Sequence, residues 1–118
     1  MRILCIGDVV GAAGCDHLRR VLPGIKRMYG IDVCVVNGEN AAEGNGLLPQ
    51  SAAHIFDSGA DVITTGNHVF RRRELYVTLD REPLLLRPAN YPSSAPGRGW
   101  CTVDRGRYQV TVINLLGL

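Results

Sequence analysis

The sequence predicts an α/β fold built around a parallel sheet. Three short apolar runs, 3–6, 31–36 and 60–65, are each followed by a polar loop and then by a segment with helical spacing. Strands that alternate with helices favour parallel pairing through right-handed crossovers. The 118 residues suffice for one domain with one sizeable core.

The first unit pairs the strand 3–6 with a long helix. Asp16 is expected to cap the start of that helix, and Gly30 is expected to end it. Pro23 lies inside the helical pattern and is expected to kink or divide it. The apolar residues that recur at helical spacing are Leu18, Val21, Leu22, Ile25 and Met28.

The second and third units repeat this order. The strand 31–36 leads through a longer loop to a helix that should begin near Pro49, because proline suits the first helical position. Gly59 should end this helix, and its sheet-facing residues should be Ala52, Ile55 and Phe56. The strand 60–65 is followed by a shorter predicted helix at 73–79.

The pattern changes after residue 83. A short buried strand is predicted at 84–86, followed by a connection rich in proline and glycine. The segments 100–104 and 108–114 then predict a hairpin around 105–107. Nothing follows to cover that hairpin, so we expect 1–118 to be the N-terminal part of a single longer domain. Its open strand edges make self-association into a homo-oligomer an expected risk.

The composition of the chain is typical of a soluble domain and indicates neither a nucleic-acid nor a membrane partner. Hydrophobic residues make up 46% of the chain and charged residues 20%, as in ordinary soluble domains. The formal net charge of +2 is too small to indicate a nucleic-acid partner, although it does not exclude one. No apolar run approaches the roughly 18 residues that a membrane span needs, so no membrane partner is expected. No targeting signal precedes the first strand.

The cysteines indicate a reducing compartment. None of the four lies in a C-x-x-C pair, which excludes the usual zinc-ribbon and thioredoxin patterns. Cys5 and Cys34 fall inside predicted strands and are expected to be small core residues. We therefore expect a cytoplasmic protein with free thiols.

Polar side chains follow each of the three predicted strands. Asp8 follows the first, Glu39 and Asn40 the second, and Asn67 and His68 the third. Glu39 lies 31 positions after Asp8, and Asn67 lies 28 positions after Glu39, which is about one strand–helix unit each time. Because the carboxyl ends of parallel strands open onto one edge of the sheet, these clusters should converge.

Such a cluster suits divalent metals. Carboxylate and amide oxygens with an imidazole can bind Mn, Fe, Mg or Zn ions, and two close carboxylates repel unless a cation or a proton lies between them. A two-metal centre activates water and clamps a phosphoryl group. Each polar residue alone could equally form a turn or cap a helix, but the three clusters together favour a shared site.

The motifs also carry a family resemblance. Gly7-Asp8, Gly38-Glu39-Asn40 and Gly66-Asn67-His68 resemble the opening motifs of the calcineurin-like metallophosphoesterases. The Glu-Asn pair of the second motif, with "GDVVG" before it and "RPANYP" after it, is similar to the bacterial YmdB-like family of 2′,3′-cyclic-nucleotide 2′-phosphodiesterases. The resemblance runs along the whole chain. It implies an α/β/β/α sandwich, here incomplete at its C-terminus, that hydrolyses small phosphodiesters.

The resemblance also implies roles for individual residues. Asp8 and Asn40 would bind a first metal ion, Glu39 would bridge two ions, and Asn67 would bind the second. His68 would give a proton to the leaving oxygen or stabilise the phosphoryl charge. The two ions would be Fe, Mn or Mg.

The sequence departs from the family in its later histidines. Family members supply further metal ligands from a "GH" and a "GHTH"-like motif, which this chain lacks. Its other histidines, His17 and His54, lie in predicted helices and are expected to be ordinary surface or partly buried residues. A non-catalytic metal-binding remnant is therefore one alternative to the enzyme.

A dinucleotide-binding domain is a second alternative. Gly7, Gly11 and Gly14 follow the first strand, but their G-x-x-x-G-x-x-G spacing differs from G-x-G-x-x-G, and Asp8 stands where a pyrophosphate should bind.

Two further sequence patterns are weaker indications of a functional site. The arginines 71–73 could hold a phosphate but are more typical of a solvated helix face. Asn90 and Tyr91 could approach the same edge of the sheet or form a structural turn.

Overall fold

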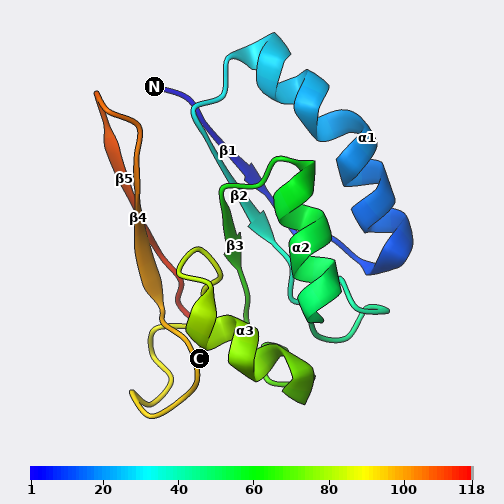
Figure 1. Ribbon diagram of the computed structural model, residues 1–118, viewed down its shortest axis with the longest axis vertical. Coiled ribbons are helices and arrows are strands. Elements are labelled where there is room, and N and C mark those ends of the chain that lie inside the picture. Colours follow the sequence, from blue (N-terminus) through cyan, green and yellow to red (C-terminus); the bar gives the residue numbers. More distant parts are fainter. Residues whose placement is uncertain (118) are drawn as a thin grey trace.

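A computed structural model of the protein describes residues 1–117 and confirms the mixed α/β class. Three parallel strands form one sheet in the order β1-β2-β3, and the last two strands form a separate antiparallel hairpin (Figure 1). The elements are β1 (Ile3–Ile6), α1 (Gly11–Tyr29), β2 (Val33–Asn37), α2 (Pro49–Ser58), β3 (Val62–Thr64), the 3₁₀ turn η1 (Arg73–Leu75), α3 (Tyr76–Arg81), β4 (Trp100–Asp104) and β5 (Gln109–Ile113).

The register of the sheet aligns the carboxyl ends of β1, β2 and β3 with one another. Ile6 at the end of β1 pairs with Val36, and Asn37 at the end of β2 pairs with Thr64 at the end of β3. The loops that leave the three strands therefore start side by side at one edge. This register positions the polar residues that follow each strand.

The sheet packs on both faces. Helices α1 and α2 cover one face, where Leu22, Ile55 and Ile63 are fully buried. The hairpin β4–β5 covers the other face, where Val103 packs in one cluster with Val33 of β2. Figure 1 shows the helices on one side of the three strands and the hairpin on the other. Each fully buried aliphatic side chain stabilises this arrangement by about 1.5–3 kcal/mol relative to exposure.

Helix α1 begins earlier than the sequence predicts. Its first residue is Gly11, and no side chain caps it, so the predicted cap by Asp16 is wrong. The N–H of Gly11 instead donates to the carbonyl of Asn40 at 3.0 Å, so a neighbouring loop satisfies the first turn. Pro23 lies on the exposed face and does not divide the helix, which runs without interruption from Gly11 to Tyr29. Gly30 ends the helix in the left-handed conformation at φ 59°, which confirms the predicted stop.

The later elements agree with the sequence in outline. Pro49 opens α2 and Gly59 follows its last residue, as predicted. The predicted helix at 73–79 is a 3₁₀ turn followed by α3. The predicted strand at 84–86 is reduced to isolated parallel bridges, one of which joins Leu85 to Ile63. No helix within residues 1–117 is long and apolar enough to cross a bilayer.

The predicted core position of Cys5 is wrong. Cys5 of β1 is exposed, and its neighbour Ile3 on the same face is 45% exposed. The hairpin packs against β2 and β3, so this face of the edge strand β1 is left without cover. Met28 in the last turn of α1 is 76% exposed, beyond the part of the helix that packs on the sheet.

Cys34 of β2 is fully buried, as predicted, and this gives a test of stability against pH. Burial raises the pKa of its thiol from 9.0 to about 11, and the Lys26 ammonium opposes that rise. Between these values the unfolded chain loses the proton and the folded chain keeps it, so stability falls as pH rises.

We expect the free energy of unfolding to drop by about 2 kcal/mol between pH 9 and 11 through Cys34. Urea titrations of the wild type and of Cys34→Ala at several pH values measure this slope. The variant will be less stable throughout but should show a shallower alkaline decline. Equal slopes in the two proteins would show that Cys34 does not carry the effect.

Candidate metal and phosphoryl site

The loops after the three strands are tied together through their backbones. The N–H of Val9 donates to the carbonyl of Asn37 at 3.1 Å, which links the first loop to the second. The N–H of Gly38 donates to the carbonyl of Thr64 at 3.0 Å, which links the second loop to β3. The polar side chains are therefore presented from one hydrogen-bonded edge.

Asn40 joins Asp8 to His68. Its Nδ2 donates to Oδ1 of Asp8 at 2.7 Å, and its Oδ1 lies 2.5 Å from Nδ1 of His68. An ionised Asp8 carboxylate only accepts hydrogen bonds, so the amide nitrogen must face it and the amide oxygen must face the imidazole. The Nδ1 of His68 then carries the proton of that bond, which leaves Nε2 free for another partner.

Glu39 is held on the other side of His68. Its Oε2 accepts the backbone N–H of His68 at 3.1 Å, and its Oε1 accepts Nδ2 of Asn37 at 3.4 Å. The imidazole Nδ1 of His68 is 4.0 Å from Oε2, so its hydrogen-bond partner is Asn40 and not the carboxylate. Only 17% of the Glu39 side chain is exposed.

Asn67 stands apart from these contacts. It is exposed, and its side chain makes no hydrogen bond to any other described residue. Asp8 is also exposed and has a positive φ of 27°, which is unusual for a residue other than glycine. Such backbone strain is concentrated at functional sites in proteins. The structure thus connects four of the five predicted site residues by hydrogen bonds, whereas the exposed side chain of Asn67 is not part of that network.

Asn37 belongs to this cluster although the sequence did not single it out. It is the last residue of β2, and its amide supports the carboxylate of Glu39. The signal was present, since an amide side chain ends an otherwise apolar strand two positions before the acid.

The side chains present fit part of a divalent metal site. Asp8, Glu39, Asn40 and Asn67 offer carboxylate and amide oxygens, which hard divalent cations prefer. No lysine or arginine within residues 1–117 pairs with the largely buried carboxylate of Glu39. A buried carboxylate without a cationic side chain is well suited to a metal ion. The described part of the chain contains no group of three or more His, Cys, Asp or Glu residues placed to hold a metal.

The arginine run lies beside the site without forming a helix face. Arg72 donates through Nε to the carbonyl of Asn45 at 2.9 Å and through Nη2 to that of Ala42 at 3.3 Å. It therefore fixes the loop that follows Asn40. Of the three arginines only Arg73 belongs to a helical element, so the predicted solvated helix face is wrong.

The "RPANYP" segment forms a structural turn. Asn90 exchanges two hydrogen bonds with the backbone of Leu116, at 2.8 and 2.9 Å. The ring of Tyr91 packs edge-on against Phe70 with centroids 5.2 Å apart. Phe70 lies two residues after His68, so the ring contact with Tyr91 helps to hold the loop that carries His68.

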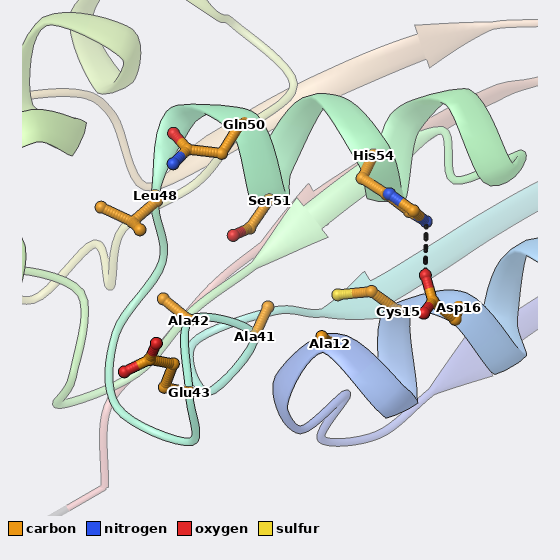
Figure 2. A pocket seen from close by; sticks show the side chains of 10 residues that line it. All are labelled: Ala12, Cys15, Asp16, Ala41, Ala42, Glu43, Leu48, Gln50, Ser51 and His54. Atoms are coloured by element: carbon orange, nitrogen blue, oxygen red, sulfur yellow. Dashed lines mark ion pairs between the residues drawn. The ribbon is translucent and has the colours of Figure 1, made fainter.

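The two remaining histidines make no hydrogen bond to this cluster within residues 1–117. His17 nevertheless lines a hollow of about 490 Å³ together with Asp8. His17 is exposed on α1, and His54 lies on α2 beside a cavity of about 310 Å³ between the first turns of the two helices. Figure 2 shows His54 pointing towards Asp16 of α1, with Nε2 and Oδ1 3.8 Å apart. This cavity is lined by none of the predicted site residues.

The glycines after β1 do not form a pyrophosphate site. The N–H of Gly11 is already bonded to the carbonyl of Asn40, and Asp8 places a carboxylate before the helix. A dinucleotide phosphate needs free N–H groups and no nearby negative charge there. The geometry therefore disfavours the dinucleotide-binding alternative.

Comparison with known proteins identifies a family and several relatives of this chain. The family model described as YmdB-like protein matches residues 4–118. The 2′,3′-cyclic-nucleotide 2′-phosphodiesterase of Bacillus subtilis (strain 168) is 44% identical over 117 residues, which cover 99% of this chain and 44% of that protein. A putative phosphatase/phosphodiesterase of Mycoplasma pneumoniae is 30% identical, with 99% of this chain and 43% of that protein covered.

Solved structures show the same fold. A hypothetical protein from Thermus thermophilus matches with a TM-score of 0.91 and 35% identity over 99% of this chain and 45% of that chain. A phosphatase from Mycoplasma pneumoniae matches with a TM-score of 0.88 and 31% identity over 98% of this chain and 42% of that chain. The chain spans less than half the length of the curated relatives it matches. The chain belongs to the YmdB-like protein family.

Proposed function

We propose that this chain forms the N-terminal part of a metal-dependent phosphodiesterase. The observation that carries the proposal is the hydrogen-bonded cluster of Asp8, Glu39, Asn40 and His68 at the carboxyl edge of the parallel sheet. The names of the relatives support a phosphodiesterase or phosphatase activity. The relative from Bacillus subtilis makes 2′,3′-cyclic nucleotides the first substrates to test.

The proposed domain has α/β/β/α layers, of which residues 1–118 contribute one part. The positions of the helices, the parallel sheet and the hairpin support this layering (Figure 1). A stretch equivalent to the remaining length of the relatives would supply the fourth layer and further metal ligands. The proposal includes a reducing, cytoplasmic setting, which the four free cysteines support.

In the proposed site Asp8 and Asn40 would hold one divalent ion, Asn67 would hold a second, and the carboxylate of Glu39 would be a ligand to both. Such ions supply Lewis acidity towards a phosphoryl oxygen and lower the pKa of water. Iron, manganese and magnesium all suit these oxygen ligands.

His68 has the separate task of protonating the leaving oxygen of a small phosphodiester. Asn40 orients its imidazole by accepting the Nδ1–H, so Nε2 is the atom that gives a proton to the leaving oxygen when the ring is doubly protonated. The backbone N–H of His68 holds Glu39 at the same time. His68 thus supplies the proposed acid through its side chain and holds the proposed bridging carboxylate of Glu39 through its backbone.

A metal-binding remnant without catalysis is the competing function. The lack of a three-residue His, Cys, Asp or Glu group within the described residues favours it. A remnant would take up metal weakly and would leave phosphodiesters intact.

Hydrolysis assays on the native full-length protein separate the two functions. We expect it to cleave bis-p-nitrophenyl phosphate and 2′,3′-cyclic AMP with Mn²⁺, and to lose this activity with a chelator. Restoration by added Mn²⁺ is the matched control. A protein that binds Mn²⁺ but hydrolyses neither compound is the remnant. Tight binding of NADH in the absence of metal would instead revive the dinucleotide-binding alternative.

A further inference from the structure

Each of the three site motifs begins with a glycine, and the three glycines have different surroundings. A Cβ atom added to Gly7 would meet nothing within 4 Å. A Cβ on Gly38 would press on core side chains, with Ile63 Cγ2 at 3.1 Å and Ile55 Cδ1 at 3.2 Å. A Cβ on Gly66 would collide with both carboxylate oxygens of Glu39, including Oε2 at 2.7 Å. Only Gly66 makes room for a residue of the proposed site.

Backbone conformation does not explain this glycine. Gly66 is absent from the glycines with positive φ, so alanine could adopt its backbone angles. Gly66 is itself buried, and its carbonyl accepts the N–H of Val69 at 3.1 Å in the turn that carries His68. The backbone here is held in place, so an added methyl group would have to displace the carboxylate.

The carboxylate of Glu39 cannot move far without losing hydrogen bonds. Its two oxygens accept the N–H of His68 at 3.1 Å and the amide of Asn37 at 3.4 Å, and its side chain is largely buried. Rotation away from Gly66 would break these bonds and leave a buried carboxylate with fewer donors.

We propose that Gly66 is a positioning residue that sets where the carboxylate of Glu39 lies. Its lack of a side chain lets the carboxylate rest against the strand end of β3, between the donors of His68 and Asn37. The consequence for metal binding rests on the proposed function, because it treats Glu39 as the bridging ligand. The steric claim does not depend on metal.

A double-mutant cycle on the metal-free native protein tests the steric claim. We expect Gly66→Ala to lower the melting temperature by about 4 °C when Glu39 is present. In the background of Glu39→Ala there is no carboxylate to displace, so the same change should shift the melting temperature by less than about 1 °C. An equal loss in both backgrounds would overturn the proposal and assign Gly66 a purely structural role.

Mn²⁺ titration by calorimetry tests the consequence for the site. Gly66→Ala should weaken Mn²⁺ binding at least about 10-fold, as misplaced ligands do, while Gly7→Ala should leave it within about 2-fold. Equal affinities for wild type and Gly66→Ala would overturn the positioning role. A wild type that binds none of Fe²⁺, Mn²⁺ and Mg²⁺ would refute the proposed function alone, because the melting-temperature cycle still decides the steric claim.

Discussion

Glu39→Gln is expected to abolish most metal binding and to lower phosphodiesterase activity by more than about 100-fold. The substitution keeps the shape of the side chain but removes the charge proposed to bridge two cations. It also breaks the local hydrogen bonds, because both carboxylate oxygens accept from donors, Asn37 Nδ2 and His68 N–H. A glutamine amide carries its own donor and cannot accept from both. Mn²⁺ calorimetry and initial rates on 2′,3′-cyclic AMP measure the two losses.

Glu43→Gln is the matched control for this variant. Glu43 lies four residues further along the same loop, is exposed, and forms no ion pair with any other described residue. The same chemical change there should leave metal binding and rate within about 2-fold of the wild type. If Glu39→Gln retained full activity, Glu39 could not be the bridging ligand.

His68→Ala should behave differently, keeping metal while turnover falls by roughly 10²–10⁴-fold. The change removes the imidazole and with it the contact to Asn40. It leaves the backbone N–H that donates to Oε2 of Glu39, so the proposed bridging carboxylate stays in place. Metal content and steady-state rates of the variant are the measurements required.

A leaving group that needs no proton sharpens this test. Hydrolysis of bis-p-nitrophenyl phosphate releases an acidic phenol, so His68→Ala should slow it less than it slows a cyclic nucleotide. His54→Ala, at a histidine of α2 beside a cavity that no proposed site residue lines, is the control and should change neither rate. Loss of metal in His68→Ala would mean that His68 is itself a ligand.

The convergence of the site could be anticipated from the sequence because it depends on topology. Apolar runs that end at Asp8, at Glu39 and at Asn67 specify three parallel strands, and parallel strands open onto one edge. What the pattern could not supply was the direction of each side chain. The bond from Asn40 to both Asp8 and His68, and the exposed position of Asn67, depend on loop conformation.

The failed predictions share a physical cause, since each depends on a neighbour distant in sequence. Asp16 was expected as a helix cap, but the carbonyl of Asn40 serves the first turn and lets the helix begin at Gly11. Cys5 was expected in the core, but the hairpin leaves that face of β1 uncovered. Gly66 was visible in its motif, but its closeness to Glu39 is a tertiary contact that no local pattern encodes.

The metal content of the native protein, purified without chelators, tests the central claim most directly. We expect elemental analysis by mass spectrometry to find two divalent ions per chain, and less than one in Glu39→Gln. Chelation should remove both metal and hydrolysis, and re-addition should restore them together. Full hydrolysis of 2′,3′-cyclic AMP by protein shown to be free of metal would contradict the account.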